Sequence, residues 1–171
     1  MKKNFVFGII LATTMGLSPS VGSAEGITGF QDFQFGMSLS DVQAITNLTQ
    51  GERHPRGQWY KASEIVTILG DEYAPSLLFN DAGILTNVSL TREFAGHRIT
   101  CKGAFDRALG AIQANHGEPD QPPERESDAV RELNSVHFTK SDGSRLTLFS
   151  YYLTSCQITV GYGAAPVGAG F

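Results

Sequence analysis

The chain has 171 residues and a formal net charge of −4 at pH 7, from 13 basic and 17 acidic residues. This length is about that of one domain, and it is enough to bury a core without help from a metal or a partner. The acidic excess and the lack of any basic block exclude the charge pattern of a nucleic-acid-binding protein and disfavour attraction to anionic lipid.

The first 24 residues have the three parts of a signal peptide. Lys2 and Lys3 form the positive region, residues 5–16 are almost wholly apolar, and Gly22-Ser23-Ala24 supplies a small-residue cut site. The apolar run is short for a hydrocarbon layer of about 30 Å. The cut site has no cysteine, so lipidation is not indicated. We therefore expect cleavage near Ala24, release into the periplasm or the medium, and no membrane span.

The mature chain is expected to form one domain over residues 25–162. Ser38 followed by Asp41 predicts a helix start, and Leu39, Val42 and Ile45 recur at helical spacing behind it. The charged segment 50–57 is predicted to be a loop. Runs rich in aromatic and branched residues then predict short strands, with a turn at residues 80–83 before the last of them: residues 58–62, 64–69, 76–79 and 84–91.

A second helix is predicted over residues 102–116. Phe105, Ala108 and Ile112 form its apolar stripe, and Gly117 followed by Pro119 ends it. The acidic, proline-rich segment 117–128 is predicted to be an exposed, partner-facing loop. Three strands follow, at residues 132–140, 144–152 and 155–162, and a flexible tail is expected over residues 163–171.

The order of these elements predicts an α+β fold with two helices packed on an antiparallel sheet. Each predicted helix precedes a meander of about three strands, which suggests two diverged helix–meander halves. The short sequence likeness between residues 77–85 and 136–148 points the same way.

Cys101 and Cys156 are the two cysteines of the chain. In an oxidising compartment such a pair favours a disulfide, and only one intramolecular pairing exists. The alternative, a redox or nucleophilic thiol, lacks the CxxC spacing.

No motif for catalysis, metal binding or cofactor binding is present. The histidines lack the HxxxH and HExxH spacings of zinc sites, and GxSxG and SxxK are absent. We therefore predict no metal and no cofactor, and we favour a protein that is not an enzyme. The alternative is a small envelope hydrolase in which at least two of four side chains converge with shifted pKa values: Asp71, Glu72, His97 and His137.

Two adjacent aromatic pairs, Trp59-Tyr60 and Tyr151-Tyr152, lie on predicted strands. Neighbours on a strand point to opposite faces, so one member of each pair leaves the helix-covered core. Exposed aromatic side chains on a sheet typically anchor a protein or glycan partner. These four residues are the predicted partner-binding residues.

Phe35-Gly36-Met37-Ser38, and the helix that ends in His116-Gly117-Glu118-Pro119, resemble segments of small bacterial periplasmic proteins. The helix-then-meander order is similar to the barrel-assembly lipoprotein type and the β-lactamase inhibitor protein type. The resemblance implies helices on an antiparallel sheet and a role in binding other proteins; it transfers no functional residue. We expect an exported binding or accessory protein of the cell envelope, or alternatively an inhibitor of a secreted enzyme. Its partner and oligomeric state stay open.

Overall fold

The computed structural model describes residues 26–165. The predicted signal peptide lies outside the described residues, as do residues 166–171 of the predicted tail. Residue 163, which was expected to begin that tail, is the last residue of a strand. No helix among the described residues is long and apolar enough to cross a membrane.

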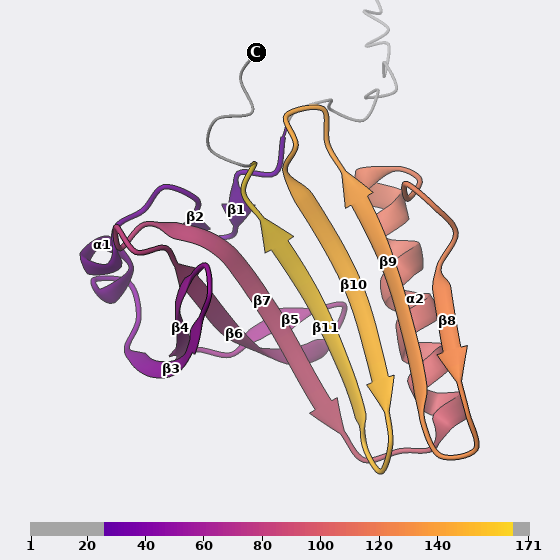
Figure 1. The fold of residues 1–171 in the computed structure, drawn as a ribbon. Helices are drawn as coiled ribbons and strands as arrows, with labels where there is room; N and C mark the ends of the chain where they lie inside the picture. Colours follow the sequence, from indigo (N-terminus) through magenta and orange to yellow (C-terminus); the bar gives the residue numbers. More distant parts are fainter. Residues whose placement is uncertain (1–25, 166–171) are drawn as a thin grey trace, which may run out of the picture.

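About half of the described chain, 49%, is β-strand and 17% is helix, and Figure 1 shows the elements in order. The first part contains β1 (Gly29–Phe30), β2 (Phe33–Gln34), α1 (Leu39–Gln43), β3 (Leu48–His54), β4 (Gly57–Ala62), β5 (Val66–Ile68), β6 (Asp71–Phe79) and β7 (Leu85–Phe94). The second part contains α2 (Arg98–His116), β8 (Glu124–Ser127), β9 (Glu132–Thr139), β10 (Arg145–Tyr152) and β11 (Cys156–Gly163).

The strands form one large antiparallel sheet with the order β3-β4-β6-β7-β11-β10-β9-β8, while β5 pairs with β6 beside this path. Strands that follow one another in the chain are mostly neighbours in space. There are two exceptions: β4 pairs with β6, and β7 pairs with β11, which joins the first meander to the second. β1 and β2 form a separate small hairpin.

The predicted packing of two helices on the sheet is wrong, because the fold has one main helix. α2 has 19 residues, whereas α1 has only five. The Ser38 cap itself is present as a reciprocal capping box with Asp41. However, Ile45 lies beyond the helix and is partly exposed, so the apolar spacing that predicted a longer helix does not form one buried stripe. The first half therefore carries only a five-residue helix in place of a second long one.

α2 covers one face of the second meander, and in Figure 1 it lies behind the strands β8 and β9. Its buried residues are spaced to face the sheet, and they include Cys101, Phe105 and Ile112. Gly117 ends the helix with a φ of 84°, a backbone conformation that favours glycine. Two further residues pack into the same core: Phe33 from the β1–β2 hairpin and Val42 from α1.

Two segments predicted to be loops contain edge strands. β3 occupies most of the predicted loop 50–57, and β8 lies inside the predicted loop 117–128. Each lies at one edge of the sheet and pairs on one side only. Their side chains are largely exposed, so neither strand has the apolar alternation by which strands are recognised.

Candidate functional site

The face of the sheet opposite α2 is the candidate site, and we call it the helix-free face. Alternation along β10 separates the two faces: Leu146 and Leu148 are fully buried under α2, whereas Thr147 and Phe149 point the other way. α1 and the β1–β2 hairpin also pack on the core side. No described helix covers the helix-free face.

Strand register brings residues from five strands into one row across this face. Trp59 on β4 is opposite Leu78 on β6, and Leu78 is opposite Asn87 on β7. Asn87 is opposite Gly163 on β11, which is opposite Arg145 on β10. Because directly opposed residues share a face, these side chains form a line from Trp59 to Arg145. With neighbouring strands about 4.8 Å apart, its ends are about 19 Å from one another.

The adjacent row has small polar residues in its centre. Ser76, Ser89 and Gly161 are opposed in sequence on β6, β7 and β11. Thr147 and His137 continue the row on β10 and β9, and the His137 Nδ1 lies 3.2 Å from the Thr147 hydroxyl. Because the side chains in the middle of this row are small and those at its ends are large, the centre of the face is recessed.

An open hollow of about 580 Å³ occupies this low region, and we call it the central hollow. Arg56 and Trp59 line one side of it, and His137 and Arg145 line the other. Glycine at position 163 contributes directly, since a Cβ there would lie 2.8 Å from the Asn87 amide nitrogen. The volume falls within the range of small-ligand and peptide-anchor pockets.

The four predicted partner-binding aromatics divide between the two faces. Tyr60 and Tyr152 pack against the core, with the Tyr60 ring 5.5 Å from that of Phe79. Trp59 and Tyr151 lie on the helix-free face and are both partly exposed. Only Trp59 lines the central hollow, so the structure does not gather the four residues into one site.

Comparison with protein-family models, curated proteins and solved structures finds no match to this chain. The likeness to the lipoprotein and inhibitor types therefore stays a prediction.

The four residues of the hydrolase alternative lie on separate elements. Asp71 begins β6 and forms an ion pair with Arg92, and Glu72 follows it. His97 is the N-cap of α2, and His137 lies on β9. The hollows that His97 and His137 line are different, and neither Asp71 nor Glu72 lines them. Among the described residues, no group of three or more His, Cys, Asp or Glu side chains is arranged to hold a metal ion.

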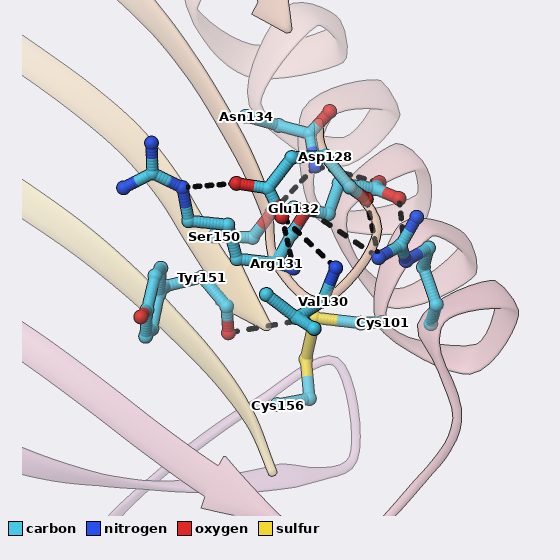
Figure 2. Close-up of polar contacts among 10 residues, drawn as sticks. Cys101, Asp128, Val130, Arg131, Glu132, Asn134, Ser150, Tyr151 and Cys156 are labelled. Carbon is cyan, nitrogen blue, oxygen red and sulfur yellow. Dashed lines mark hydrogen bonds and ion pairs between the residues drawn. A yellow bond between two sulfur atoms is a disulfide. The ribbon is translucent and has the colours of Figure 1, made fainter. Parts of the chain in front are cut away.

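Cys101 and Cys156 form a disulfide that ties the first turn of α2 to the start of β11. Their Cα atoms are 5.4 Å apart, and both side chains are buried. Figure 2 shows the Cys101 sulfur beside the backbone carbonyl oxygen of Tyr151, a contact of 3.8 Å. The disulfide is compatible with an oxidising compartment outside the cytoplasm. Its burial assigns it a structural role.

Hydrogen bonds to Asp128 order the loop between β8 and β9, as Figure 2 also shows. The backbone N–H groups of Val130 and Arg131 both donate to its Oδ1 at 2.9 Å. These two bonds, with the Arg131 guanidinium, lower the pKa of Asp128. Arg98 of α2 donates to the Asp128 backbone carbonyl at 2.9 Å, so this loop is fastened to the helix.

Sequence reasoning missed five residues that line the hollow: Asn87, Ser89, Gly161 and Gly163 on its floor, and Arg145 on one side. One pattern in the sequence could have indicated some of these residues. On the last strand, every residue facing away from the core is polar or glycine, from Gln157 to Gly163, whereas the alternate residues are apolar or aromatic. That pattern indicates a strand with one solvent-facing side, but it does not show which other strands contribute to that face.

Asp120 fastens the segment before β8 to β9 next to the central hollow. The Thr139 hydroxyl donates to its Oδ2 at 2.7 Å, and the Thr139 backbone N–H donates to its Oδ1 at 2.9 Å. These bonds lower the pKa of Asp120, with a smaller contribution from His137 and Arg145. A carboxylate whose pKa is lower in the folded state stabilises the fold above its unfolded pKa, and this stabilisation is lost as pH falls through the folded pKa.

We therefore expect Asp120→Asn to be less stable than the wild type at pH 7, and the difference to shrink as the pH falls below about 4. Urea unfolding of both proteins across a pH series measures this. Glu118→Gln, two residues earlier in the same segment, is the control. A difference between Asp120→Asn and wild type that is independent of pH would contradict the assignment.

Proposed function

We propose that the chain is an exported binding protein of the cell envelope whose recognition surface is the helix-free face around Trp59. The central hollow carries the proposal, because it combines one large aromatic side chain with a floor of small polar residues. A few residues carry most of the binding energy of a protein interface, and tryptophan is enriched among them. The predicted signal peptide and the buried disulfide support an extracytoplasmic location.

The surroundings of Trp59 suit it to anchor a partner. Its cross-strand neighbour Leu78 is fully buried although it faces away from the main core. The His54 ring lies on its other side, with the ring centroids 6.4 Å apart. A second hollow of about 480 Å³, lined by Thr49 and Lys61 among others, adjoins the central one at Trp59 and Ser89. A partner that covered both hollows would enclose the indole.

The experiment is affinity capture from an envelope extract, with the full mature chain as bait. We expect a protein to be captured by the wild type and its recovery to fall at least about tenfold with Trp59→Ala, the effect of losing an interface anchor. Ser89→Trp, which fills the hollow and leaves Trp59 in place, should have the same effect. The matched control is Ile99→Ser, which alters an exposed apolar residue on α2.

Equal recovery by the wild type and both hollow variants would contradict the proposal, as would failure of the wild type to capture any protein above background. Loss with Ile99→Ser alone would move the interface to the helix. If the captured protein is an enzyme, its activity in the presence of the wild-type chain decides whether binding is inhibitory.

A further inference from the structure

We infer that the partner segment entering the central hollow is an acidic loop, whose carboxylates pair with Arg56 and Arg145; this rests on the proposed function. The hollow is lined by two arginines and His137, and no described aspartate or glutamate lines it. The chain as a whole has more acidic than basic residues. A cationic hollow on an acidic protein is a local departure that favours an anionic ligand.

The two arginines also differ from most others in the chain. Arg53, Arg92, Arg98, Arg125 and Arg131 each form an ion pair with a carboxylate. Among the described residues, no ion pair is formed by Arg56, Arg145 or Arg107, and the first two line the same hollow. Their guanidinium groups are exposed and have donors left for a bidentate carboxylate.

The acidic groups nearest the central hollow lie outside its lining. Glu124 lines the hollow beside His137 and Arg145, and Glu52 lines the one beside Trp59. Asp81, on the turn between β6 and β7, pairs with Arg53. Asp120 is close enough to Arg145 to feel its charge, but both of its oxygens accept bonds from Thr139, and it lines a neighbouring hollow. Lys61, one row from Trp59, adds a further positive charge to this face.

The shape of the hollow suits a loop rather than a flat surface. Ser89 and Gly161 keep its floor low between the two cationic sides, and the sides are separated by several strands. Asn87 adds a side-chain amide to the floor. A loop can therefore place its backbone over the small residues while its acidic side chains reach the arginines.

Trp59 is the single tryptophan of the chain, so its fluorescence reports directly on the hollow. The test titrates the full mature chain at low salt with a hexaglutamate peptide, with hexaglutamine as the neutral comparison. We expect a saturable change in Trp59 emission with hexaglutamate only. The double variant Arg56→Gln/Arg145→Gln should weaken the apparent affinity by at least about tenfold, as expected for lost charge-assisted bonds.

The matched control is Arg107→Gln, which removes an unpaired arginine from α2 and should leave the titration unchanged. No saturable change with hexaglutamate, an equal response to hexaglutamine, or an equal loss with Arg107→Gln would each overturn the inference. A polyglucuronate arm addresses acidic glycans: binding of this polymer without binding of the peptide would also overturn it.

The capture experiment separates this inference from the proposed function. If capture is lost with Trp59→Ala but unaffected by Arg56→Gln/Arg145→Gln, the face binds a partner through other chemistry, and only the acidic-loop inference fails. If capture is insensitive to both, the proposed function fails with it.

Discussion

Replacing Cys101 and Cys156 together by alanine is expected to lower the free energy of unfolding by about 4 kcal/mol. The disulfide joins residues separated by 55 positions in sequence, so it removes many conformations from the unfolded chain. It also links the sheet covalently to α2, at the end where the helix begins. Urea unfolding of the double variant and the wild type, both under non-reducing conditions, measures the difference.

The control is the wild type unfolded and refolded in the presence of a reductant, which should match the double variant closely. Single cysteine variants are avoided because they leave a free thiol. A loss of less than about 1 kcal/mol would mean that the unfolded state is already restricted or that the disulfide is absent in solution.

Replacing Phe105 by alanine is expected to destabilise the protein by about 3–5 kcal/mol. Phe105 is on the sheet-facing side of α2 and is fully buried, so its removal leaves a cavity between the helix and the sheet. Since α2 is the main helix of the fold, no neighbouring helix can close that cavity. The free energy of unfolding from urea denaturation tests the value.

Phe149→Ala is the matched control, because it deletes the same side chain from the helix-free face. Phe149 is only partly buried and lies outside the main core, so its loss should cost less than about 2 kcal/mol. If the two substitutions cost the same, the core is not confined to the α2 side of the sheet.

The second half of the fold was largely predictable from sequence, because the sequence patterns that indicate its elements are local. The apolar stripe of α2 and the alternation in β10 and β11 each extend over several turns or residue pairs. The hairpin turn at Asp142-Gly143 has a strong local signal of its own. Such patterns need no knowledge of distant residues.

The elements that were predicted wrongly from the sequence share one property: their side chains are largely exposed. β3 and β8 are edge strands; β8 has only polar side chains and β3 has one apolar residue, Leu48, so neither has a hydrophobic period. The α1 segment has a correct cap and helical spacing, but Ile45 is not on a buried face and the helix ends at Gln43. Local signals start these elements, and the surrounding sheet decides their extent.

The candidate site could be predicted only in part. Alternation separates Trp59 from Tyr60 and Tyr151 from Tyr152, and the structure places one of each pair on the helix-free face. The assembly of the central hollow depends on the pairing of β7 with β11, which brings together residues about 75 positions apart. No local pattern carries that information.

The most direct test of the helix-free face as a binding surface is site-specific photo-crosslinking in the intact cell envelope. A photoreactive phenylalanine is placed at Thr49, exposed on β3 beside Trp59 and outside the central hollow, and separately at Arg107, exposed on α2. We predict a discrete crosslink to a partner protein from position 49 and none from position 107. Crosslinking from position 107 alone, or from neither position, would contradict the account.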